Sequence, residues 1–174
     1  MTSWLYSRVA AILVAVFMCM MLPASVPAEI AARAKRQAAP DFSRNDAKNS
    51  VIRLSDYKGK VVLLNFWATW CHGCKLEIPW FMEFQDKHKR EGLAVIGVSM
   101  DEDGWKSVKP FLEEKKLNYP VVIGDNGLAD QYGLGSMPYS VLIDRDGRIA
   151  DSHSGVVDKE GWEAEIRALL GEKH

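Results

Sequence analysis

The sequence has few cysteines, no excess of charge of one sign and no internal repeat. Among 174 residues there are 3 cysteines, too few for a scaffold held together by disulfides. Lys and Arg number 22 and Asp and Glu 23, so the formal net charge is −1 and the basic footprint of a nucleic-acid-binding protein is missing. Hydrophobic residues make up 48% and charged residues 26%, a composition typical of one globular domain at this length.

The N-terminal end carries the longest apolar run. Arg8 is the only charged residue before Glu29, and residues 9–22 are apolar without interruption. A positively charged N-terminal region, a short apolar region and a following stretch of small residues are typical of a secretory signal peptide. The apolar run together with the small residues after it is also long enough for an uncleaved membrane anchor. We therefore expect an exported chain. The expected divisions are a signal peptide or signal anchor over 1–28, a linker over 29–39 and one domain over 40–174.

Export suggests a chemical purpose for the remaining cysteines. Cys19 falls inside the expected leader, which leaves Cys71 and Cys74 in the domain. Disulfides persist in exported proteins, but these two cysteines close too short a loop to stabilise a domain by much. Their spacing therefore favours redox chemistry over a structural role.

Strand and helix patterns alternate along the domain. Two continuous apolar runs, 61–67 and 93–100, are typical of central strands covered on both faces. An Asp-Gly turn near the C-terminus predicts an antiparallel hairpin at one edge. Together these features predict an α/β fold with a mixed central sheet, helices on both faces and an extra N-terminal β-hairpin. The expected strands are 41–43, 51–54, 61–67, 93–100, 119–123, 140–144 and 148–153, and the expected helices are 74–90, 102–116, 127–133 and 159–170.

The cysteine pair lies where the first central strand gives way to a helix. At a helix N-terminus, unpaired N–H groups and the helix dipole would stabilise a thiolate on Cys71, which predicts that Cys71 is the nucleophile. Cys74 follows one turn later and is expected to resolve the mixed disulfide. A C-x-x-C motif beside a strand–helix pattern predicts a redox-active dithiol.

The residues around this motif resemble a known family. Residues 66–75 read Phe-Trp-Ala-Thr-Trp-Cys-His-Gly-Cys-Lys, and Glu77 and Pro79 follow. This pattern resembles the thioredoxin fold and, more closely, the exported TlpA/ResA-like thiol–disulfide oxidoreductases of the AhpC/TSA-Redoxin superfamily. The resemblance covers about 40–170. It implies a thioredoxin-like three-layer fold and a cis peptide before Pro138, packed against the cysteines beside backbone that holds the substrate.

Further residues are expected to tune or shape the site. Glu77 matches a glutamate of ResA-like members and lies on the same side of the helix as Cys74, so we expect it to tune or deprotonate that thiol. An ordinary helix-surface glutamate is the alternative. A protonated His72 would stabilise the Cys71 thiolate, although it could equally be a plain solvent-facing residue. The expected site-shaping residues are Trp70, His72, Gly73, Met137 and Pro138.

Three positions depart from the relatives. Asn65 stands where thioredoxin has a buried acid, and an asparagine cannot take up a proton. Met137 replaces the common threonine before the proline. Tyr139 stands where members that mature cytochromes often carry an acid or threonine, so a dedicated cytochrome role is not favoured.

Two other classes remain open at this stage. A thiol peroxidase of the peroxiredoxin type shares the fold outline, but Thr69-Trp70-Cys71 is one residue short of that family's Thr-x-x-Cys pattern. A copper-binding thioredoxin-like chaperone could use both cysteines and a distant histidine. A structural zinc site requires four ligands, and two cysteines without clustered histidines do not supply them.

The expected function is therefore disulfide exchange outside the cytoplasm, without an organic cofactor or metal. The family resemblance favours net reduction of disulfides in exported client proteins, apocytochrome c among them, and implies a membrane thiol donor that recharges the pair. We expect a periplasmic or other extracytoplasmic monomer that is secreted or tethered to the inner membrane through 1–28, with no nucleic-acid partner.

Overall fold

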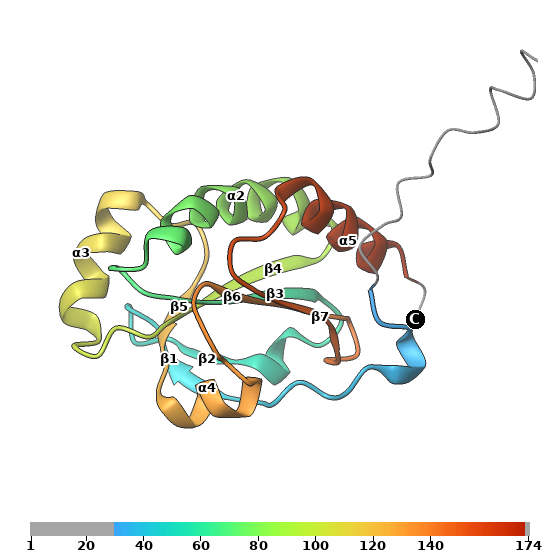
Figure 1. Cartoon of the computed structure of the whole chain (residues 1–174), viewed down its shortest axis with the longest axis horizontal. Coiled ribbons are helices and arrows are strands. Elements are labelled where there is room, and N and C mark those ends of the chain that lie inside the picture. Colours follow the sequence, from blue (N-terminus) through green and yellow to red (C-terminus); the bar gives the residue numbers. More distant parts are fainter. Residues whose placement is uncertain (1–29, 173–174) are drawn as a thin grey trace, which may run out of the picture.

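Residues 30–172 are described by the computed structural model, and the expected leader with Cys19 lies outside them. Within 30–172 no helix is long and apolar enough to cross a lipid bilayer. A five-stranded sheet forms the middle layer, with helices above and below it (Figure 1). The main elements are β1 (Ser43–Asn45), β2 (Val51–Arg53), β3 (Val61–Trp67), α2 (His72–His88), β4 (Leu93–Ser99), α3 (Trp105–Lys115), β5 (Val121–Ile123), α4 (Asn126–Tyr132), β6 (Tyr139–Ile143), β7 (Ile149–Ser154) and α5 (Lys159–Gly171); short 3₁₀ turns lie at Arg33–Lys35, Leu54–Tyr57 and Lys89–Glu91.

The central sheet is mixed, as expected. Its strand order is β5-β4-β3-β6-β7. The pairs β3–β4 and β4–β5 are parallel, and the pairs β3–β6 and β6–β7 are antiparallel. The hairpin β1–β2 is a separate two-stranded sheet. The structure thus confirms the thioredoxin-like α/β fold, with the N-terminal hairpin as an addition to it.

The alternation of side chains along β3 divides the core into two layers. Leu63 and Trp67 belong to the cluster that includes residues of α2, α3 and α5. Leu64 and Phe66 belong to the cluster that includes residues of α4 and of the 3₁₀ turn after the hairpin. All seven residues of β3 are buried, which is why six of them are apolar and Asn65 is the one polar residue of the strand.

All eleven expected strands and helices occur, and all but the strand over 61–67 have shifted ends. Helix α2 begins at His72, two residues earlier than expected, because Cys71 caps it. Helix α3 begins at Trp105 and not at residue 102, since Gly104 before it adopts a positive φ of 56°. Strand β5 begins only after Pro120, which has no N–H for a sheet ladder.

The described part of the expected linker packs along the outer strand of the sheet. The backbone N–H of Ile149 donates to the carbonyl of Gln37 at 2.8 Å. The guanidinium of Arg36 is buried and lies 3.0 Å from Asp144 and 2.6 Å from Glu172. This segment therefore joins the first described residues to the C-terminal end of α5.

Candidate active site

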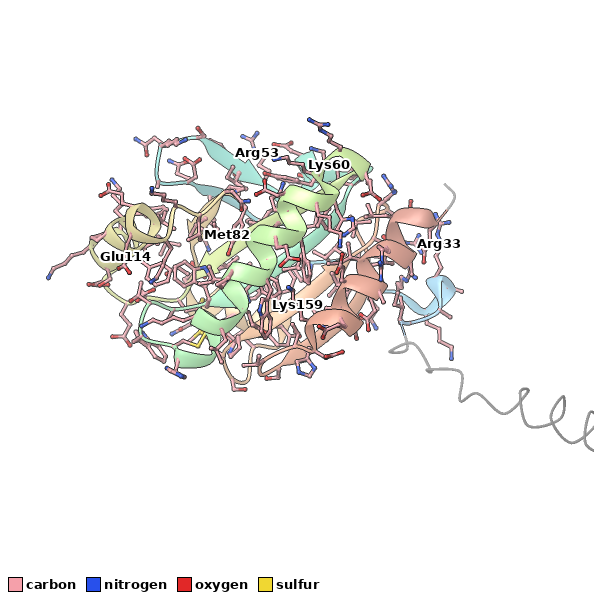
Figure 2. The ribbon with its side chains drawn as sticks, turned by 90° about the horizontal axis from the view of Figure 1, so that it is seen from above. Arg33, Arg53, Lys60, Met82, Glu114 and Lys159 are labelled. Atoms are coloured by element: carbon pink, nitrogen blue, oxygen red, sulfur yellow. A yellow bond between two sulfur atoms is a disulfide. The ribbon has the colours of Figure 1, made fainter. Side chains whose placement is uncertain are left out.

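Cys71 and Cys74 form a disulfide at the N-terminal end of α2, which Figure 2 shows as a yellow bond. Their Cα atoms lie 5.3 Å apart. Cys71 is the N-cap residue, and its Sγ accepts a hydrogen bond from the backbone N–H of Cys74 at 3.2 Å. Cys71 retains 6% exposure and Cys74 none. The more accessible cysteine thus lies at the helix end, where unpaired N–H groups favour a thiolate.

Glu77 lies one turn after Cys74 on α2 and is fully buried. Its Oε1 accepts a hydrogen bond from the backbone N–H of Val157 at 2.7 Å. Its Oε2 is buried without a hydrogen-bond partner in the described part of the chain. Burial raises the pKa of Glu77 to about 7, and the Val157 N–H opposes part of that rise. Glu77 is therefore not a helix-surface residue, and its carboxyl can take up and release a proton near neutral pH.

Asn65 sits in the middle of β3, buried beneath the layer that contains α2. Its side-chain amide donates to the hydroxyl of Ser140 on β6 at 3.0 Å. Both residues are fully buried, and they are register partners across the β3–β6 pair. A neutral hydrogen-bonded pair thus occupies the position where the sequence comparison with thioredoxin leads one to look for an acid. Glu77 is accordingly the buried acid carried by the helix of the cysteine pair.

The loop before β6 lies against the turn between the two cysteines. The peptide bond between Met137 and Pro138 is cis, as the resemblance implied. A Cβ atom added to Gly73 would lie 3.2 Å from Pro138 Cδ and 3.0 Å from Val156 Cγ2. Gly73 therefore allows both neighbouring loops to approach closely. Pro138 is buried, and Met137 is half-buried against the core.

Exposed apolar side chains occur on the segments that flank the cysteine pair. Trp70, directly before Cys71, is 66% exposed, and Leu76 on α2 is 50% exposed. Val156, which contacts Gly73, is 40% exposed. His72 is exposed at the first position of α2. Sequence reasoning singled out Trp70 and His72 but missed Leu76 and Val156, because a single apolar residue in a helix or loop carries no signal of its own.

Asp101 is a third residue that sequence reasoning missed. It follows β4, and its buried carboxylate accepts a hydrogen bond from the backbone N–H of Thr69 at 2.9 Å. Thr69 lies in the turn between β3 and Cys71. Because β3 and β4 are parallel neighbours, their carboxyl ends meet at one edge of the sheet, where sites in α/β folds commonly form. An acid directly after the second apolar run was therefore a usable signal.

Within residues 30–172 there is no group of three or more His, Cys, Asp or Glu side chains arranged to hold an ion.

The chain is similar to several known proteins. It matches the AhpC/TSA family over residues 36–152. It is 38% identical over 133 residues to the thiol-disulfide oxidoreductase ResA of Bacillus anthracis, covering 75% of this chain and 76% of that relative. It is also 38% identical over 132 residues to the thioredoxin-like protein YneN of Bacillus subtilis, covering 75% and 77%.

The chain is also similar to solved structures. A Chlorobium tepidum protein described as the thiol:disulfide interchange protein DsbE superposes with a TM-score of 0.74 at 37% identity, covering 78% of this chain and 97% of that one. The exposed lipoprotein thioredoxin Etrx1 of Streptococcus pneumoniae superposes with a TM-score of 0.67 at 29% identity, covering 75% and 100%.

Proposed function

Since the chain belongs to the AhpC/TSA family and is a thiol-disulfide oxidoreductase, we propose that Cys71 attacks client disulfides and that Cys74 resolves the adduct. The observation that carries this assignment is the difference between the two sulfurs. Cys71 caps α2 and keeps some exposure, whereas Cys74 is covered completely. A client sulfur can therefore reach Cys71 first, and the helix N-terminus favours its thiolate.

The reaction runs in two exchange steps. The Cys71 thiolate attacks one sulfur of a client disulfide, so that the client S–S bond breaks and the second client sulfur leaves as a thiolate and takes up a proton. The Cys74 thiolate then attacks Cys71 Sγ and expels the first client sulfur. The client gains two electrons and becomes a dithiol, and the enzyme ends as the Cys71–Cys74 disulfide.

Glu77 takes the Cys74 proton in the second step. A buried thiol needs a base close to it, because transfer of its proton to bulk water is blocked. Burial raises the pKa of Glu77 to about 7, near the value at which a group accepts and returns protons most effectively at neutral pH. The Val157 N–H fixes one carboxyl oxygen and leaves Oε2 free for the proton.

The clients are disulfide-containing proteins of an exported compartment, and the direction of transfer is reduction. The exposed side chains of Trp70, next to Cys71, and of Val156, next to Gly73, support binding of an extended client segment beside the disulfide. Apocytochrome c is one candidate client, although Tyr139 does not offer it an acid. The Tyr139 hydroxyl donates a hydrogen bond to the backbone carbonyl of Tyr132 within the fold. A membrane thiol donor regenerates the dithiol, and the leader over 1–28 directs or anchors the chain outside the cytoplasm.

The division of labour is tested by trapping. The full-length Cys74→Ser variant, incubated reduced with a disulfide-containing peptide, should accumulate a mixed disulfide at Cys71 that mass spectrometry locates. The matched Cys71→Ser variant should accumulate little adduct, since Cys74 is buried. An adduct that forms on Cys74 in preference to Cys71 would reverse the proposed roles. Consumption of hydrogen peroxide without any peptide adduct would favour the peroxidase alternative.

A further inference from the structure

The carboxylate of Asp101 is built into the turn that presents Cys71. Its oxygens accept hydrogen bonds from the Thr69 backbone N–H at 2.9 Å, from the Thr69 hydroxyl at 2.5 Å and from the Ser99 hydroxyl at 2.8 Å. Asp101 is only 5% exposed. Three donors from the ends of two strands thus converge on one buried carboxylate. Two of these donors belong to Thr69, which stands two positions before Cys71.

The surrounding backbone makes this turn rigid. The N–H of Met100 donates to the carbonyl of Trp67 at 2.8 Å, which joins the ends of β4 and β3. The N–H of Cys71 donates to the carbonyl of Ala68 at 3.1 Å and closes the turn. Asp101 is therefore connected to Cys71 through one short hydrogen-bonded turn.

The donors to Asp101 are all neutral. In the described part of the chain Asp101 takes part in no ion pair, and its hydrogen-bond donors are one backbone amide and two hydroxyls. Neutral donors stabilise a buried carboxylate without cancelling its charge. At short range in a poorly solvated site, such a charge acts strongly on a neighbouring thiolate.

We propose that Asp101 positions the 68–71 turn and that its negative charge opposes the Cys71 thiolate, which makes the pair more reducing. The helix N-terminus favours the thiolate, and a stabilised thiolate favours the reduced form and gives an oxidising enzyme. A fixed negative charge held by Thr69, in the turn that leads to the same sulfur, has the opposite effect and favours the disulfide. The inference rests on the proposed role of Cys71 and supplies a physical reason for net reduction.

The charge is tested with Asp101→Asn in the full-length chain. The amide oxygen still accepts from Thr69, so the turn is kept while the charge is removed. We expect the equilibrium constant for disulfide formation against glutathione to fall about tenfold, which corresponds to about 30 mV. Alkylation of Cys71 by iodoacetamide at neutral pH should become faster. An unchanged equilibrium constant and alkylation rate would overturn the proposal.

Asp144→Asn is the matched control. Asp144 is also a buried carboxylate, but it follows the opposite end of β6 from Pro138 and is held by Arg36. We expect this variant to lose stability and to keep the wild-type equilibrium constant. An equal shift in both variants would mean that the effect comes from weakened folding, and it would overturn the role of Asp101.

Thr69→Val gives a second variant that keeps the proposal falsifiable if Asp101→Asn does not fold. This change removes one of the two hydroxyl groups that donate to Asp101, so the negative charge of the carboxylate is less dispersed. The cysteine pair should therefore become more reducing, whereas Asp101→Asn should make it more oxidising. A shift towards oxidation, or no shift, would overturn the proposal. The redox titration of the wild-type chain against glutathione tests the proposed function separately. If the wild-type chain does not form its disulfide, or if Cys74 is alkylated in preference to Cys71, the proposed function itself is contradicted.

Discussion

The backbone N–H of Val157 donates a hydrogen bond to the buried carboxyl of Glu77 at 2.7 Å. This contact ties the loop between β7 and α5 to the helix that carries the cysteine pair. It holds a titratable group one helical turn beyond Cys74, in surroundings that raise the pKa of Glu77 to about 7. The proton transfer proposed above and the pH dependence of the fold therefore involve the same side chain.

Glu77→Gln should slow the resolving step and change its pH profile. Glutamine can still accept the hydrogen bond from Val157, so the loop contact is kept, but the variant has no carboxylate to take the Cys74 proton. In the wild type the rate should rise with pH as Glu77 ionises around pH 7. In the variant we expect a loss of about 100-fold at neutral pH and no such rise. Stopped-flow measurement of mixed-disulfide resolution against pH checks this.

Glu83→Gln is the control for that experiment. Glu83 lies on the same helix but is exposed and pairs with Lys159. Its replacement should leave the rate and its pH profile unchanged. A Glu77→Gln variant with the wild-type pH profile would show that another group takes the proton.

The oxidised fold should lose stability as the pH rises from about 4.5 to about 7. Burial raises the pKa of both Glu77 and Glu165 to about 7 from the ordinary 4.5, and the charge of Asp151 adds to the rise at Glu165. The folded state therefore binds more protons than the unfolded state in this range, so the free energy of unfolding falls with pH. The stabilisation is complete below pH 4.5 and is lost above pH 7.

Glu165→Gln isolates one of these two contributions. Both carboxyl oxygens of Glu165 are buried, no donor in residues 30–172 reaches them, and the carboxyl of Asp151 lies near them, so the ionised form of Glu165 is poorly accommodated. Urea unfolding at pH 5 and pH 8 gives the change in the free energy of unfolding between the two pH values. In this variant that change should be smaller than in the wild type, by roughly 1.4 kcal/mol for each unit of pKa shift removed. A wild-type free energy of unfolding that rises over this range would contradict the assignment.

Trp70→Ala should weaken client binding and leave the fold intact. The indole is 66% exposed, so its removal costs the folded state little. We expect KM for a disulfide-containing peptide to rise several-fold, with the glutathione equilibrium of the pair unchanged. Val51→Ala is the matched control, since Val51 is 48% exposed in the separate hairpin. Equal KM values in the two variants would exclude Trp70 from the client surface.

Arg36→Ala should destabilise the protein by about 3 kcal/mol. The side chains of Arg36 and Asp144 are 3% and 4% exposed, so loss of the cation leaves a buried carboxylate without its partner. Arg33→Ala, which removes a cation from an exposed pair with Asp146, should destabilise the protein much less than Arg36→Ala. Urea denaturation compares the two variants. The thiol chemistry should be the same in both, because neither residue contacts the cysteine pair.

The sheet and the cysteine turn could be predicted from sequence because their signals are local. The run at 61–67 has the length and composition of a buried strand, and Cys71 and Cys74 stand directly after it. The adjacent residues Trp70, His72 and Gly73 could be named for the same reason. The start of α2 was missed by two residues, since capping by a cysteine sulfur has no distinct sequence pattern.

Contacts between distant segments could not be predicted in the same way. Asp101 reaches Thr69 across 32 positions of sequence, and Val157 reaches Glu77 across 80. Val156 approaches Gly73 only because the strand order puts β7 next to β6. The burial of Glu77 depends on those packed loops, which is why its raised pKa follows from the structure and not from its place on the helix.

The most direct test of the central claim is the reduction potential of the Cys71–Cys74 pair in the full-length chain, measured against glutathione or dithiothreitol. We expect a value near or below that of thioredoxin, about −270 mV, because a reductase must lose electrons to its clients. A value near that of strong oxidants, about −120 mV, would contradict net reduction. Failure to form the internal disulfide at any potential would contradict disulfide exchange by this pair altogether.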